Sequence, residues 1–168
     1  MITFDIDHVR FHYRAAGVFL REGHVLLCTV EGLDFWFIPG GRCEAMETSA
    51  DAVAREVREE LGMAARVERL LWVVENFFTH AGKSAHELGL YYLMALPPDS
   101  LLLDTGGTFH GDEHGERMTY RWFPLDELER TRVYPIFLRK ALQRIPDAIQ
   151  HIVNVDNKEE DTAITAYT

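Results

Sequence analysis

The chain lacks most of the features that mark extracellular, membrane or disulfide-rich proteins. It has two cysteines, Cys28 and Cys43, and no C-x-x-C pair, so neither a disulfide framework nor a cysteine metal site is indicated. No apolar run is long enough to cross a membrane. The first residues have no basic segment followed by an apolar stretch, as a secretory signal would. We therefore expect a cytoplasmic protein without a membrane partner.

Basic residues are also scarce relative to acidic ones. Lysine and arginine total 17 against 27 aspartates and glutamates, which gives a net charge of −10 at pH 7. This balance argues against general binding to nucleic acid through its phosphates. It does not argue against a small phosphorylated substrate, because a divalent metal ion would screen the negative charges of both partners.

The length and the hydrophobic pattern predict one domain with a mixed sheet. At 168 residues the chain can build its own core without disulfides or a structural metal. Apolar and polar residues alternate from Val9, then become apolar on both faces up to Leu20, as in a strand that enters the interior. Similar reasoning predicts strands at residues 25–30, 35–38, 67–78, 88–96, 118–123 and 149–155, helix starts at 124 and 135, and a loop at 104–117. The domain should cover residues 1–156, followed by a flexible tail at 157–168.

A helix of about four turns is predicted from Thr48 to Leu61. Thr48 followed by Asp51 is typical of a helix N-cap with its capping partner. Gly62 comes just after the last periodic residue, where a left-handed C-cap is usual. One face of this helix should be apolar, formed by Ala50, Val53, Ala54, Val57 and Leu61.

Three carboxylates fall on one flank of that apolar face: Glu56, Glu59 and Glu60. Glu56 and Glu60 are like-charged i,i+4 neighbours, which disfavours an isolated helix by a few tenths of a kcal/mol. They also lie in the C-terminal half, where the helix dipole favours cations. Local stability therefore does not explain the cluster. A hard divalent cation such as Mg²⁺ does, because it binds carboxylate oxygens and bridges to phosphates. The alternative interpretation is a solvated acidic face.

Residues 41–63 match the pattern G-x5-E-x7-R-E-U-x-E-E-x-G-U at every fixed position, where U is a bulky aliphatic residue. Average residue frequencies put a chance match on the order of one in ten million. This pattern is the Nudix box, and the chain resembles the Nudix hydrolase family. The segments W-F-I-P-G-G before the helix and W-F-P-L-D-E-L late in the chain extend the resemblance. It implies an α+β fold, an α/β/α sandwich around a mixed central sheet.

The resemblance also implies a reaction and a set of residues. The enzyme would use Mg²⁺ or Mn²⁺ to cleave a diphosphate linkage in a nucleoside diphosphate joined to another group, releasing a nucleoside monophosphate. The metal ligands would be Glu56, Glu59, Glu60 and the carbonyl of Gly40. The catalytic residues would be Glu56, Glu59 and Arg55, with Glu56 as the preferred general base. The residues that hold the shape of the box would be Gly41, Glu47 and Gly62.

Candidates outside the box are fewer and each has an alternative interpretation. Arg14 lies in a basic row that either meets substrate phosphate or forms a solvated sheet face. Glu75 and its neighbour Asn76 interrupt an apolar strand. The Glu75 carboxylate must be paired or face a cleft, and Glu75 is a candidate for substrate binding in a pocket. Glu113 and Glu116 lie in the predicted loop and are candidates for a further acidic group near the metal; the alternative is a solvated loop.

The partner is expected to be a small nucleotide rather than nucleic acid, and a homodimer is left open. Two other functions stay as alternatives. One is a non-catalytic nucleotide-binding regulatory module on the same scaffold. The other is an isomerase acting on an allylic diphosphate, which would need a cysteine and an acid in the pocket. The sequence contains no signature that selects one nucleotide substrate.

Overall fold

The computed structural model describes residues 1–80, 82–113, 116–156 and 164–167. Its strands are β1 (Thr3–Ile6), β2 (Val9–Arg21), β3 (His24–Val30), β4 (Gly40–Arg42), β5 (Arg66–His80), β6 (Lys83–Ala95), β7 (Thr108–Glu113), β8 (Glu116–Pro124), β9 (Gln150–Val155) and β10 (Ile164–Tyr167). Its helices are α1 (Ser49–Leu61), α2 (Leu138–Ala141) and the 3-10 turns η1 (Leu101–Leu103) and η2 (Leu125–Glu127). None of the helices in these ranges is long and apolar enough to span a membrane.

The strands form one mixed sheet, as predicted. Its order is β10-β9-β5-β6-β2-β3-β8-β7, and β1 and β4 also pair with β2. The central pair β2–β6 is parallel, whereas β5–β6, β2–β3 and β3–β8 are antiparallel. Strand β2 has 13 residues and pairs with β1, β3, β4 and β6 along its length. It therefore joins the two halves of the sheet.

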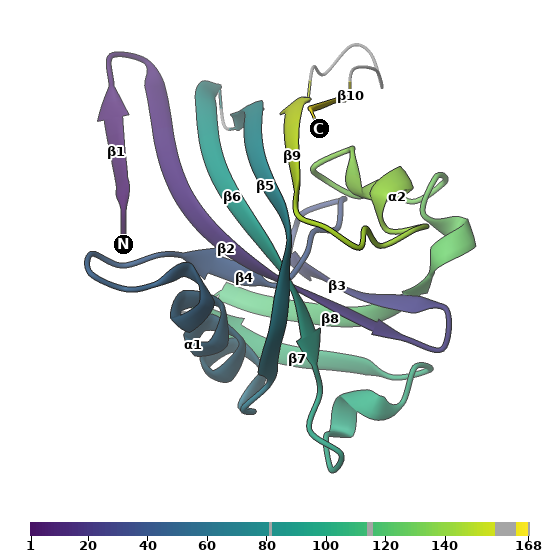
Figure 1. The fold of residues 1–168 in the computed structure, drawn as a ribbon. Coiled ribbons are helices and arrows are strands. Elements are labelled where there is room, and N and C mark those ends of the chain that lie inside the picture. The colour runs from purple at the N-terminus through teal and green to yellow at the C-terminus, as the bar shows by residue number, and fades with distance from the viewer. Residues whose placement is uncertain (81, 114–115, 157–163, 168) are drawn as a thin grey trace.

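The two faces of the sheet carry separate cores, because successive side chains of β2 point to opposite faces. Ala15 and Phe19 belong to the core that α1 covers, together with Val53 of the helix. Ala16 belongs to the core on the other face, together with Leu138 of α2. Figure 1 shows α1 and α2 on opposite sides of the sheet. The predicted α+β sandwich is therefore confirmed.

The predicted loop at residues 104–117 was wrong for residues 108–113 and 116–117, which lie in strands. Strands β7 and β8 pair in antiparallel register from Thr108↔Arg121 to Glu113↔Glu116. β7 contacts α1 and makes the edge of the sheet. An edge strand rich in Gly, His and Asp lacks the apolar alternation by which strands are recognised in a sequence, and its pairing partner supplies the missing hydrogen bonds.

The strand expected at residues 35–38 was also misplaced. This segment forms only isolated bridges, at Trp36 and Phe37, and the strand comes later as β4. The predicted helix at residues 135–145 reduces to the four residues of α2, and the predicted helix start at 124 is the 3-10 turn η2. Asp156 and Asn154 accept hydrogen bonds from the backbone N–H groups of residues 136 and 137, just before α2.

The proposed division into a domain at residues 1–156 and a flexible tail stays a prediction. Within that tail, β10 pairs antiparallel with β9.

Candidate active site

Helix α1 is built by the local signals in its sequence. The Thr48 hydroxyl accepts a hydrogen bond from the backbone N–H of Asp51 at 3.1 Å, so Thr48 is the N-cap. Gly62 adopts a left-handed φ of 68° and its N–H bonds to the Arg58 carbonyl at 3.0 Å. The helix packs Val53 and Val57 against the sheet. This packing fixes which way the acidic flank faces.

Two of the three carboxylates are turned inward by this packing. Glu56 and Glu60 are 4% and 5% exposed, whereas the Glu59 side chain is 55% exposed. The Tyr120 hydroxyl, on β8, donates to Glu60 Oε2 at 3.1 Å. Burying a carboxylate is unfavourable unless charges or hydrogen bonds compensate. Two buried carboxylates one helical turn apart are therefore a concentrated negative site inside the fold.

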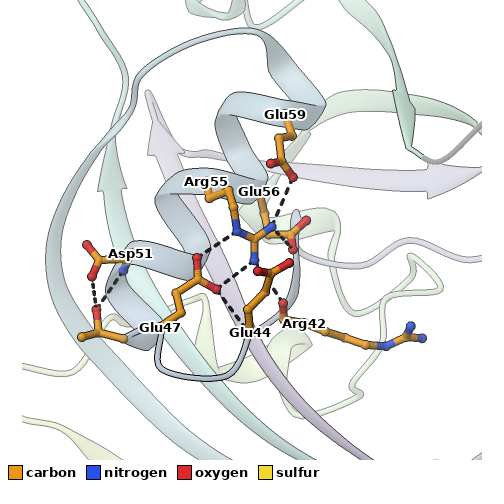
Figure 2. A network of polar contacts seen from close by, with 8 residues as sticks. Arg42, Glu44, Glu47, Asp51, Arg55, Glu56 and Glu59 are labelled. Carbon is orange, nitrogen blue, oxygen red and sulfur yellow. Dashed lines mark hydrogen bonds and ion pairs between the residues drawn. The ribbon is translucent and has the colours of Figure 1, made fainter. Parts of the chain in front are cut away.

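Arg55 holds this site together (Figure 2). Its Nε and Nη2 donate to the two oxygens of Glu47 at 2.8 and 3.0 Å, a bidentate pair. Its Nη1 donates to Glu56 Oε1 at 2.8 Å and to Glu59 Oε2 at 3.2 Å. Its Nη2 also reaches the Arg42 carbonyl at 3.2 Å, at the end of β4. One guanidinium thus connects the loop, β4 and the carboxylates of α1.

Electrostatics keep this cation and its loop partner charged. Hydrogen bonds from Arg55 lower the pKa of the Glu47 carboxyl, and the backbone N–H of Glu44, at 2.9 Å, acts in the same direction. The hydrogen bond to Glu47 raises the pKa of the Arg55 guanidinium in turn, and Glu56 adds to this effect. The pair is therefore fully ionised at neutral pH.

Two glycines of β4 are required by the space around them. Gly40 has a φ of 137°, and a Cβ there would lie 2.3 Å from the Ala15 carbonyl oxygen. At Gly41 a Cβ would lie 2.3 Å from Glu56 Cδ and within 2.5 Å of both carboxylate oxygens. The Glu56 carboxylate therefore packs directly onto the backbone of Gly41.

This donor set fits a hard cation such as Mg²⁺. Glu56 and Glu60 offer buried carboxylate oxygens, and Glu56 packs on the backbone of Gly41, the residue after Gly40. Among the side chains that the structure describes, no three acidic, histidine or cysteine groups gather closely enough to hold an ion by themselves. Mg²⁺ commonly binds through one or two carboxylates and completes its shell with water and substrate phosphates. Glu59, which is exposed and bonded to Arg55, stays a predicted ligand.

The remaining predicted residues are not brought together. Gly89 of β6 pairs with both Arg14 of β2 and Val74 of β5, so Arg14 and Val74 share a face and Glu75 lies on the opposite one. The Glu75 carboxylate is 40% exposed and lies 2.8 Å from His151 Nε2. Glu75 therefore meets the expectation of a paired carboxylate, and it does not share a pocket with Arg14.

Glu113 and Glu116 end β7 and begin β8, where their backbones pair with each other. Their side chains lie outside the described residues, so their predicted role near the metal stays a prediction.

Sequence reasoning missed a second group of buried polar side chains. Asn76, Glu87 and Asn154 are 4%, 9% and 0% exposed. Asn76 and Glu87 could have been found by their place in apolar strands. Asn154, between two valines in a short strand, gave the same signal and was overlooked.

Comparison with known proteins decides the family. A model of the NUDIX domain matches residues 11–145, well over half of the chain. The chain belongs to the Nudix family. The match includes the box, β4 and α1, which carry the carboxylates and Arg55 described above.

Relatives and solved structures agree with this assignment. The Nudix domain is similar to the low-salt glycan biosynthesis protein Agl8 of Haloferax volcanii, with 35% identity over 52% of this chain and 61% of that protein. It is also similar to diphosphoinositol polyphosphate phosphohydrolase 2 of Rattus norvegicus, with 40% identity over 42% of this chain and 41% of that protein. The chain thus matches less than two thirds of each of these relatives.

The fold matches that of a MutT protein from Bacillus halodurans, with a TM-score of 0.60, 16% identity and coverage of 92% of this chain and 97% of that one. A MutT protein from Methanosarcina mazei gives a TM-score of 0.56 at 20% identity, covering 83% and 95%. At these identities the likeness concerns the fold alone.

Proposed function

We propose that this Nudix domain hydrolyses a diphosphate linkage in a nucleoside diphosphate joined to another group, such as a nucleoside triphosphate or a nucleotide sugar. The products would be a nucleoside monophosphate and a phosphorylated remainder. The observation that carries the proposal is the pair of buried carboxylates, Glu56 and Glu60, on one flank of α1. The name of one relative, a diphosphoinositol polyphosphate phosphohydrolase, supports diphosphates as the substrate class.

The residues of the site would take different roles in this reaction. Glu56, Glu60 and the Gly40 carbonyl would hold Mg²⁺ or Mn²⁺. When bound, such an ion neutralises charge on the diphosphate and lowers the pKa of a bound water. Glu56, fixed by Arg55 at 2.8 Å, would accept the proton of the attacking water. The water oxygen bonds to one phosphorus while the bridging P–O bond breaks, and the second phosphate leaves with its oxygen.

The isomerase alternative gains no support from the cysteines. Cys28 and Cys43 are both buried. Burial raises the pKa of the Cys43 thiol to about 11, so the reactive thiolate is scarce at neutral pH.

A turnover assay with a nucleotide panel tests the proposal. Nucleoside triphosphates, nucleotide sugars and dinucleotides would be incubated with Mg²⁺, and monophosphate release followed by chromatography. We expect hydrolysis that stops with EDTA and returns with excess Mg²⁺. Glu56→Gln and Glu60→Gln should each lower kcat at least about a hundredfold, as expected for a lost catalytic group. Glu129→Gln, an exposed acid far along the chain, is the control and should leave kcat unchanged.

Two outcomes would count against the proposal. Wild-type rates in a folded Glu56→Gln variant would remove Glu56 from the mechanism. Tight nucleotide binding without any turnover would favour the non-catalytic regulatory module.

A further inference from the structure

The buried polar side chains on the α2 face form a continuous row across three strands. Glu87 of β6 pairs with Asn76 of β5, and Asn76 pairs with Asn154 of β9. Residues paired across neighbouring strands lie on the same face of a sheet. That face is the one covered by the core of α2, because Ile152 and Tyr91 belong to this core and lie two and four residues away on their strands.

Hydrogen bonds give this row a direction. Asn154 Oδ1 accepts from the backbone N–H of Phe137 at 3.3 Å, and Asn154 Nδ2 donates to Asn76 Oδ1 at 2.8 Å. Because the Asn76 carbonyl is the acceptor, its amide nitrogen faces the other way, toward the strand that carries Glu87. The row of amides that begins beside α2 thus ends with an amide donor group on the side of Glu87.

The carboxylate at the end of the row lies on the same face of the sheet as Arg14. Arg14 pairs with Gly89, two residues after Glu87 on the same face of β6. Gly89 has no side chain, and Glu87 Oε1 lies 3.7 Å from the position that a Cβ there would take. Burial raises the pKa of the Glu87 carboxyl, and the charge of Arg14 opposes this rise. Burial alone would lower the pKa of Arg14, but Glu87 and other negative groups outweigh it and the pKa is raised.

The backbone of Arg14 lies beside the proposed active site, with its side chain on the α2 face of the sheet. The next residue, Ala15, pairs with Gly41, on which the Glu56 carboxylate packs. Arg14 Nη2 donates to the Ile38 carbonyl at 3.0 Å, two residues before Gly40. The guanidinium is therefore tethered to the segment that carries the proposed metal-binding carbonyl.

We propose that Arg14 binds a phosphate group of the substrate, and that Glu87, held by the Asn76–Asn154 row, is the positioning residue that orients Arg14. The proposal rests on the diphosphate hydrolase function given above. Two buried charged side chains are a poor way to gain stability, since apolar residues of similar size often do better. A guanidinium matches phosphate geometry when it is held in one orientation, which the row of amides provides.

A double-mutant cycle tests this arrangement. Arg14→Met keeps most of the side-chain volume without the charge, and Glu87→Gln keeps an acceptor for Asn76 without the charge. With the best substrate of the panel, we expect KM to rise about a hundredfold for Arg14→Met and about tenfold for Glu87→Gln, as for removal of one partner of a buried charged pair. In both, kcat should change less than about threefold, because the groups that accept the proton and hold the metal are intact.

The double variant gives the decisive comparison. If Glu87 acts only through Arg14, the double variant should equal Arg14→Met within about a factor of two, because the two effects then share one cause. Multiplied effects would overturn the positioning role. Glu129→Gln is the control, because Glu129 is an exposed acid outside the row and should leave KM unchanged.

A binding measurement separates this inference from the proposed function. Titration calorimetry with the non-hydrolysable analogue α,β-methylene-ADP and Mg²⁺ needs no turnover. Weakened analogue binding in Arg14→Met and Glu87→Gln supports the inference even if the panel shows no hydrolysis. Normal hydrolysis with unchanged analogue binding in Arg14→Met refutes it and leaves the function standing. If Glu87→Gln fails to fold, Arg14→Lys replaces it, and unchanged binding there would contradict the need for an oriented guanidinium.

Discussion

Replacing Gly41 by alanine should lower activity about a hundredfold while leaving the fold nearly intact. The new Cβ would lie 2.3 Å from Glu56 Cδ, whereas ordinary contacts begin near 3.4 Å, so the carboxylate must move by at least about 1 Å. The backbone does not resist the change, because Gly41 is not among the residues with positive φ. The clashing group is the end of a flexible side chain, so strand and helix need not shift.

A displacement of this size falls on the residue proposed to accept the proton. A misplacement of about 1 Å at a reacting centre can lower a rate about a hundredfold. We therefore expect kcat of Gly41→Ala to fall by about that factor, while the free energy of unfolding drops by less than about 2 kcal/mol, within the usual range for overpacking. Both would be measured on one preparation, by nucleotide hydrolysis and by urea unfolding.

The control for this experiment is Gly106→Ala. Gly106 also lacks a positive φ, and a Cβ there would meet only the Asp104 side chain, at 3.5 Å. It should match the wild type in both assays. If folded Gly41→Ala hydrolysed nucleotides within about threefold of the wild-type rate, the orientation of the Glu56 carboxylate would not govern catalysis, contrary to the general-base assignment.

Two further predictions follow from the charged groups. Arg55→Lys should lower kcat about tenfold or more and lower the free energy of unfolding by about 1–3 kcal/mol. The reason is that one ammonium group cannot form the bidentate pair with Glu47 and also hold Glu56. Hydrolysis kinetics and urea unfolding would show whether both effects occur. Burial and nearby arginines lower the pKa of His12 to about 4, so the unfolded chain binds a proton in the window between about 6.5 and 4 that the native state does not. The free energy of unfolding should therefore fall as the pH drops through this window, and His12→Gln should remove about 1–2 kcal/mol of that fall, a figure reduced because the side chain is only half buried. Urea unfolding at pH 7.5 and 4.5 would measure this, with the exposed His8→Gln as the control. If His12→Gln lost as much stability between the two pH values as the wild type, the assignment would be contradicted.

Helix α1 could be predicted almost to the residue because its signals are local. The N-cap hydroxyl of Thr48, the apolar periodicity and the glycine at position 62 each act within one or two turns of the chain. The carboxylates were placed on the right flank for the same reason. Their burial was not predictable, since it depends on β4 and β8 packing against that flank from distant parts of the sequence.

Strand pairing limited the rest of the prediction. The segments at β4 and β7 have no clear hydrophobic alternation, and they become strands only because β2 and β8 supply partners. Glu75 was preferred over its neighbour Asn76 as a pocket residue, although Asn76 belongs to the buried row. Which of two adjacent residues faces a core depends on the register of the strand. In β5 two irregularities, between Val67 and Arg69 and between Leu70 and Trp72, shift that register.

The contrast between local helix signals and packing by distant segments also explains how the site is built. Local rules alone would disfavour α1 as it is, with like charges one turn apart at the C-terminal half of a helix. The apolar stripe of Val53 and Val57 nevertheless fixes the helix on the sheet, and this docking carries Glu56 and Glu60 into the interior. The hydrophobic core thereby holds two carboxylates in a geometry that their mutual repulsion opposes. A bound cation would relieve that repulsion, which is why metal binding should stabilise the fold as well as enable the reaction.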